Sequence, residues 1–77
     1  MAHTPHELAE EFPDKTDRIH ELKTENSHFR KLFDEYHEVN RTVHRAETNV
    51  EPMDSIAEQY LRKRRMRLKD ELAKLIG

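Results

Sequence analysis

The sequence predicts an all-α protein in which two long helices fold back on each other as an antiparallel, coiled-coil-like hairpin. Three observations predict this fold. Large apolar residues recur at helical spacing over most of the chain, the only glycine is the terminal Gly77, and Pro52 separates two long apolar patterns. Because glycine and proline are the residues that usually interrupt helices, their scarcity in the interior favours long helical segments.

The composition limits the size of the core. Seventy-seven residues allow one domain, with 34% hydrophobic and 39% charged residues. A chain of this length buries only about 60% of its unfolded surface, so a monomer with a single core is marginally stable. There is no cysteine, which excludes disulfides, thiolate metal sites and a cysteine nucleophile. We therefore expect the protein to be stabilised by packing against a partner.

The net charge and the lack of targeting signals indicate where in the cell the protein is expected. The net charge is −2, which gives no general attraction to nucleic acid or to anionic lipid. The N-terminal sequence MAHTPHEL lacks a basic region followed by an apolar one, and no apolar run approaches the roughly 18 residues that span a bilayer. We expect a cytoplasmic protein that does not contact the membrane.

Residues 1–12 are predicted to be a flexible or short helical N-terminal arm. Thr4, Pro5 and Glu7 have the residue types of a helix start, with a capping hydroxyl, a proline in the first turn and a glutamate that completes a capping box. Pro13 disfavours helical angles at Phe12 and can open the next segment. The hairpin is therefore predicted over residues 13–77.

The first long segment, residues 14–47, carries a heptad pattern. Asn26 and Ser27 interrupt this pattern, and because both are residue types that favour the N-cap, we expect the helix to break near residue 26. Ile19 and Phe33 widen the apolar stripe beyond the width of a two-stranded seam. The residues at the a and d positions are Leu22, Phe29, Leu32, Tyr36, Val39, Val43, Ala46 and Val50.

The connection is predicted over residues 48–53, and the second helix over residues 54–76. Asp54 or Ser55 can cap that helix. Its apolar face comprises Ala57, Leu61, Leu68, Leu72 and Leu75. Because so short a connection makes the helices antiparallel, each leucine should face a residue of the first helix. The expected pairs are Leu61 with Val39, Leu68 with Phe33, Leu72 with Phe29, and Leu75 with Asn26.

Self-association is expected because the hairpin leaves apolar side chains uncovered. Phe33, Tyr60, Met66 and Ile76 are predicted to form an outer flank, which a second hairpin could cover in a helical bundle. The chain is therefore predicted to be a homo-oligomer. Its predicted interaction surface consists of Phe29, Phe33, Tyr36, Tyr60 and Met66.

The second helix contains a basic stretch for which two interpretations remain open. The predicted register places this stretch opposite Asp34, Glu35 and Glu38, which favours ion pairs between the helices. The alternative is contact with a polyanion such as nucleic acid. A helix distributes such residues around more than two turns, so they form no single flat patch. The basic residues are Arg62, Lys63, Arg64, Arg65, Arg67 and Lys69.

Neither a metal site nor catalysis is predicted. None of the six histidines is four residues from another, and His37 and His44 are separated by two helical turns, about 10.5 Å. We expect His20, His28, His37 and His44 to lie on or beside the helix surface; a metal shared between copies in an oligomer stays an alternative. No glycine loop suits phosphate, so no cofactor and no enzymatic activity are expected.

Two stretches resemble a known family. The sequences LKTENSHFRKLFDEYHEVN, residues 22–40, and RLKDEL, residues 67–72, are similar to those of the YdcH-like family of small bacterial proteins of unknown function. The resemblance covers residues 12–77, and it departs at Ser27, where the family usually has proline. It implies a helical hairpin in the bacterial cytoplasm and implies no activity or ligand. Asn26, His28 and residues 29–35 are the segments that it singles out.

The predicted function is that of a small, non-catalytic helical interaction module. Such a module would self-associate and present a charged surface to a protein partner. The alternative is a nucleic-acid accessory protein that binds through residues 62–69.

Overall fold

The computed structural model describes residues 6–48 and 53–77, and its regular structure is helical throughout these ranges. The elements are α1 (Leu8–Glu11), the 3₁₀ turn η1 (Pro13–Lys15), α2 (Thr16–Glu25), α3 (Ser27–Glu47) and α4 (Ser55–Ile76). The all-α class and the pairing of α3 with α4 as a hairpin are confirmed. Thr4, Pro5, Val50 and Pro52, with most of the predicted connection, lie outside the described residues.

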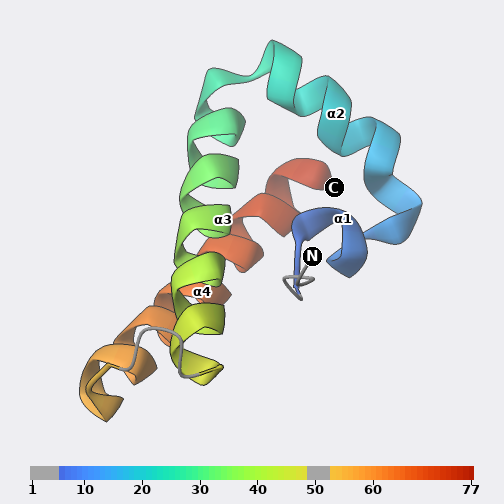
Figure 1. The fold of residues 1–77 in the computed structure, drawn as a ribbon. Helices are drawn as coiled ribbons and strands as arrows, with labels where there is room; N and C mark the ends of the chain where they lie inside the picture. The colour runs from blue at the N-terminus through green and yellow to red at the C-terminus, as the bar shows by residue number, and fades with distance from the viewer. Residues whose placement is uncertain (1–5, 49–52) are drawn as a thin grey trace.

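The two long helices form the body of the molecule, and the N-terminal residues fold over one of its ends (Figure 1). Figure 1 shows α2 leaving the start of α3 at an angle and α1 returning toward the C-terminal part of α4. The principal extents of the molecule are 37 × 26 × 17 Å. α1 and α2 are therefore part of the same compact body as the hairpin.

The chain changes direction at Asn26, as its residue type predicts. Asn26 is extended, with φ −124° and ψ 104°, and its side-chain oxygen Oδ1 accepts a hydrogen bond from the backbone N–H of Phe29 at 3.0 Å. Its own N–H donates to the carbonyl of Leu22 and so ends α2. One residue thus terminates one helix and caps the next. At α4, Asp54 occupies the N-cap position without a side-chain capping bond.

Replacement of Asn26 by alanine should lower the free energy of unfolding by about 1 kcal/mol, because the N-terminal end of α3 loses its cap. Asn26→Asp keeps the acceptor oxygen and should cost less. Urea denaturation followed by circular dichroism measures both. Equal losses for the two variants would show that the side-chain oxygen does not stabilise the bend.

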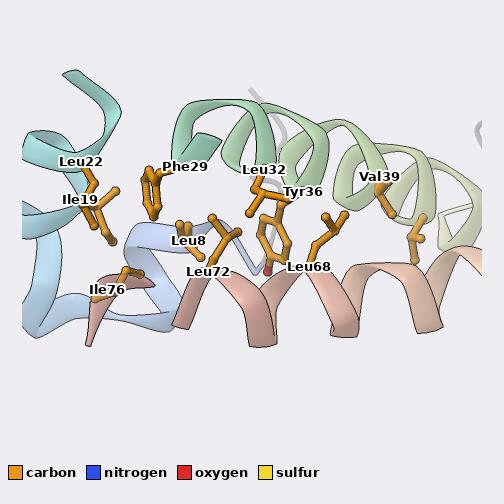
Figure 2. Packing of buried hydrophobic residues seen from close by; sticks show 11 residues of the cluster. Leu8, Ile19, Leu22, Phe29, Leu32, Tyr36, Val39, Leu68, Leu72 and Ile76 are labelled. Atoms are coloured by element: carbon orange, nitrogen blue, oxygen red, sulfur yellow. The ribbon is translucent and has the colours of Figure 1, made fainter. Parts of the chain in front are cut away.

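The core runs along the facing sides of α3 and α4 (Figure 2). Figure 2 shows Leu72 pointing toward the part of α3 between Phe29 and Leu32, and Leu68 lying beside Tyr36. The heptad positions in the described residues are all buried: Leu22, Phe29, Leu32, Tyr36, Val39, Val43 and Ala46. The apolar face of α4 is confirmed at its C-terminal half.

The first turns of α4 are less covered than the pattern predicts. Ala57 is exposed and Leu61 is half-buried, whereas Leu68 and Leu72 are buried. The C-terminal half of α4 is covered by α2 as well as by α3, and Leu8 of α1 belongs to the same core. Burial along α4 therefore follows the number of helices that reach it.

Of the two forms expected for the N-terminal arm, the described residues adopt the short helical one, and they pack against the hairpin. Leu8 is fully buried, and the hydroxyl of Tyr36 donates to the carbonyl oxygen of His6 at 2.6 Å. The predicted helix start is wrong: Glu7 is the extended N-cap residue, with ψ 148°, and the helix begins at Leu8. Phe12 leaves helical geometry before Pro13, as expected.

The predicted outer flank is wrong at two of its four residues, because α2 covers them. Ile76 is 5% exposed and lies beside Ile19 of α2 in Figure 2. Phe33 is partly buried, with its ring 4.3 Å from the His37 ring and the Lys23 ammonium 4.4 Å above it. The N-terminal residues thus provide much of the cover that a second copy was expected to provide.

Candidate functional site

The side of α4 that faces away from α3 carries large apolar side chains in water. Ile56 is 75% exposed, Tyr60 is 62% exposed and Met66 is 59% exposed. Helical spacing places Lys63 and Arg67 on the same side. Neither cation forms an ion pair with any described residue. We call this surface the α4 outer face: Ile56, Tyr60, Lys63, Met66 and Arg67.

The predicted interaction surface is only partly present in the structure. Phe29 and Tyr36 are buried in the core, at 0% and 1% exposure, so their prediction as surface residues is wrong. Phe29 and Tyr36 occupy heptad positions, and heptad positions face the partner helix. In this hairpin the partner helix is α4 of the same chain, so the two side chains are not available to another protein. Phe33 packs under α2, so Tyr60 and Met66 are the predicted interaction residues that remain exposed. The sequence-based prediction did not include Ile56, although its position one helical turn before Tyr60 places both side chains on the same side of the helix.

Four of the six predicted basic residues contact groups of the same chain. Arg62 lies 3.3 Å from Glu47 and 3.5 Å from Glu58, and Arg64 pairs with Glu35. Arg65 donates to the Asn40 side-chain oxygen at 3.0 Å, and the Lys69 ammonium lies 3.4 Å from Glu11. Of the predicted acidic partners only Glu35 is confirmed. Asp34 and Glu38 are exposed and join no ion pair with a described residue.

A cleft of about 320 Å³ opens between the N-terminal residues, α3 and α4. Arg62, Arg65 and Lys69 line its α4 side, and Glu11 lines the opposite side. His6 donates a hydrogen bond to Glu11, and this bond, with Lys69 nearby, holds the pKa of the Glu11 carboxyl below its usual value although burial opposes the shift. We call this space the α1–α4 cleft.

Tyr36 lies at the floor of the same cleft. Burial, and secondly the charge of Glu11, raise the pKa of its hydroxyl to about 12. The hydroxyl is therefore protonated at neutral pH and remains the donor to the His6 carbonyl.

A second pocket, of about 250 Å³, lies among α1, α2 and α3, with His37 in its wall. The prediction that His37 lies at the surface is wrong: it is 7% exposed, its Nδ1 faces the Glu7 carboxylate, and its Nε2 has no hydrogen-bond partner among the described residues. The cause is its position four residues after Phe33, on the side that α2 covers. His20 and His28 are exposed, and His44 is half-buried.

The stability of the protein should fall in mild acid because of His37. Burial lowers the pKa of its imidazole from the ordinary value of 6.5, against the opposing effect of Glu7. The unfolded chain therefore takes up this proton before the folded one, so the contribution is complete above about pH 6.5 and is lost as the pH falls toward the folded pKa. For one proton the slope is at most about 1.4 kcal/mol per pH unit.

Urea denaturation between pH 7.5 and pH 5 measures this effect. His37→Gln should flatten the dependence of the unfolding free energy on pH, and the matched change at exposed His28 should leave it as in the parent protein. Identical pH dependence in the parent and the His37 variant would contradict the assignment.

Within residues 6–48 and 53–77, no group of three or more histidine, aspartate or glutamate side chains is arranged to hold a metal ion. None of the helices formed by these residues combines the length and apolar character needed to cross a bilayer.

Comparison with protein families identifies the hairpin. The model of DUF465, a protein family of unknown function, matches residues 29–76. The chain belongs to the DUF465 family. This confirms the resemblance seen in the sequence, because the YdcH-like proteins are members of DUF465. The search of curated proteins and that of solved structures returned no match to the chain.

The match to the DUF465 model covers α4 and nearly all of α3, and it stops short of α1 and α2. The α4 outer face and the cationic side of the α1–α4 cleft therefore lie within the DUF465 region. His6, Glu7 and Glu11, which complete the two pockets, lie outside it.

Proposed function

We propose that this DUF465 protein is a non-catalytic helical interaction module that binds another protein through the α4 outer face. The observation that carries the proposal is the exposure of Ile56, Tyr60 and Met66 on one helix, α4, whose C-terminal half is packed in the core. Grouped exposed apolar side chains with a polar surround are typical of binding surfaces. Tyrosine is among the residues that contribute most to the binding free energy of interfaces.

The charges on this surface favour an acidic partner. Lys63 and Arg67 lie among the apolar side chains without a carboxylate partner from the described residues. A partner helix that presents apolar side chains flanked by aspartate or glutamate would cover the exposed apolar side chains of the α4 outer face and neutralise Lys63 and Arg67. The partner class is therefore an acidic amphipathic helix.

A second copy of the chain suits this face less well. In a twofold dimer each surface meets itself, so packing α4 against α4 would bring Lys63 and Arg67 near the same cations of the other copy. The original reason for self-association was an uncovered flank, and α2 now covers Phe33 and Ile76. Self-association is therefore the second candidate.

Nucleic-acid binding through residues 62–69 is favoured less than protein binding. Arg64 pairs with Glu35, and Arg62, Arg65 and Lys69 line the α1–α4 cleft. An extended phosphate backbone would therefore meet only Lys63 and Arg67 on an open surface. We place the proposed activity in the bacterial cytoplasm, with the family resemblance as support.

A photo-crosslinking amino acid at Tyr60 tests the proposal in cells of the source organism. The same amino acid at Thr24, which is exposed on α2, is the matched control. We expect one discrete protein adduct from position 60 and none from position 24. Adding Lys63→Glu should remove the adduct, because it reverses the charge that attracts the partner.

The mass of the adduct identifies the kind of partner. An adduct of two copies of this chain would show self-association in place of an acidic partner. An adduct with nucleic acid would show that the basic stretch binds a polyanion. No adduct from position 60, or equal adducts from both positions, would overturn the proposal.

A further inference from the structure

The α1–α4 cleft is a second candidate site; it lies beside the α4 outer face and shares Met66 with it. Its α4 side presents Arg62, Arg65 and Lys69, whose spacing of three and then four residues places all three on the same side of the helix. Glu11 is the only carboxylate among the described residues that line the cleft. The lining therefore carries an excess of positive charge.

Arg65 is the residue that most requires a counter-ion. Its side chain is partly buried, and the hydrogen bond recorded for its guanidinium joins Nη1 to the neutral amide of Asn40 at 3.0 Å. No carboxylate of the described residues lies within ion-pair distance of it. Because removing a cation from water is costly unless it is paired, the charge of Arg65 favours an anion in the cleft.

The neighbouring cations are held loosely. The distances of 3.4 Å from Lys69 to Glu11 and 3.3 Å from Arg62 to Glu47 exceed the roughly 2.7–2.9 Å of a strong charge-assisted hydrogen bond. The Glu11 oxygen near Lys69 also accepts the hydrogen bond from His6 at 2.9 Å. Lys69 can therefore turn toward a ligand while Glu11 keeps its bond to His6.

We infer that the α1–α4 cleft binds a small, multiply charged oxyanion of the phosphate class. Apart from Nη1, the N–H groups of the Arg65 guanidinium have no hydrogen-bond partner among the described residues, and their planar arrangement matches two phosphate oxygens. Lys69 supplies a second charge one turn along α4. The cleft volume lies at the lower end of the roughly 300–1,000 Å³ usual for ligand pockets, which suits a compact anion.

A nucleic-acid backbone fits this site less well than a free anion. His6 and Glu11 line the cleft on the side opposite α4, so its cationic wall is not an open surface. Glu11 would also repel the further phosphates of a polymer. The ligand is therefore a small molecule.

Titration with inorganic pyrophosphate tests the inference, with amide NMR signals as the readout and ionic strength held constant with sodium chloride. We expect saturable shifts centred on residues 62–69 and 36. Arg65→Gln should weaken the affinity at least about tenfold, because a charge-assisted contact is lost. Arg67→Gln removes the same charge two residues away on the outer face and should leave the affinity within about twofold.

Lys69→Gln provides a second variant in case Arg65→Gln does not fold, and it should also weaken binding. Equal weakening by the Arg65 and Arg67 changes would show general charge attraction and overturn the site. So would the absence of saturation at millimolar pyrophosphate. Tighter binding of a single-stranded oligonucleotide that depends on Arg67 would replace the small anion by a nucleic acid.

Discussion

Replacement of Phe29 by alanine should leave about half of the protein or more unfolded at 25 °C. Phe29 is fully buried where α1, α2, α3 and α4 contribute to one core, and truncation of a buried phenylalanine costs about 3–5 kcal/mol. A domain of this size rarely has more than about 3–5 kcal/mol of stability to lose. The loss of Phe29 therefore removes about as much stability as the fold possesses.

Circular dichroism in increasing urea measures this loss. Ile56→Ala is the matched control, since Ile56 is a large apolar residue that is 75% exposed, and its truncation should change the unfolding free energy by about 0.5 kcal/mol or less. A Phe29 variant that unfolds at the same urea concentration as the Ile56 variant would contradict the described core.

Leu8→Ala should destabilise the whole protein by about 2–5 kcal/mol, although Leu8 belongs to a helix of only four residues. The reason is that Leu8 is fully buried in the core cluster, where Figure 2 places it next to Leu72. The unfolding free energy from urea denaturation is the measurement. Leu8→Met keeps the volume of the side chain and should cost less than about 1.5 kcal/mol.

The urea unfolding transition of Leu8→Ala shows whether α1 stabilises the hairpin. If α1 is an integral part of the core, the single unfolding transition moves to lower urea for Leu8→Ala. An unchanged transition would mean that α1 contributes nothing to the stability of the hairpin.

The sequence was sufficient for the hairpin because its signal is periodic. Phe29, Tyr36 and Val43 repeat every seven residues, and such a repeat specifies which side of a helix is buried whatever the partner. The bend at Asn26 was also predictable, because it depends on a hydrogen bond between neighbours in the sequence.

The position of the N-terminal residues was not predictable from local pattern. α1 has one buried residue, Leu8, and a single large apolar side chain in a helix of four residues creates no measurable period. The burial of Leu8 depends on tertiary contacts between α1 and the hairpin. One of the contacts in this region is the hydrogen bond from the Tyr36 hydroxyl to the backbone carbonyl of His6, thirty residues away. The same limitation explains why Phe33 and His37 were expected at the surface.

The candidate sites divide in the same way. The pairing of Arg64 with Glu35 followed from charge complementarity between antiparallel helices. The contacts of Arg65 with Asn40 and of Lys69 with Glu11 required the packing of α3 on α4 and the return of α1. The α1–α4 cleft exists only because of that return, so no spacing in the sequence could indicate it.

Residues 6–25 pack against the hairpin as part of one core. A spin label on Ala9→Cys tests this packing directly by NMR, because the chain has no other cysteine and Ala9 is exposed beside the pocket that contains His20, Lys23 and His37. Packing of α1 and α2 against the hairpin predicts strong broadening of amide signals in residues 20–23 and 33–37, and little at residues 55–59. Broadening confined to the sequence neighbours of Ala9 would contradict it.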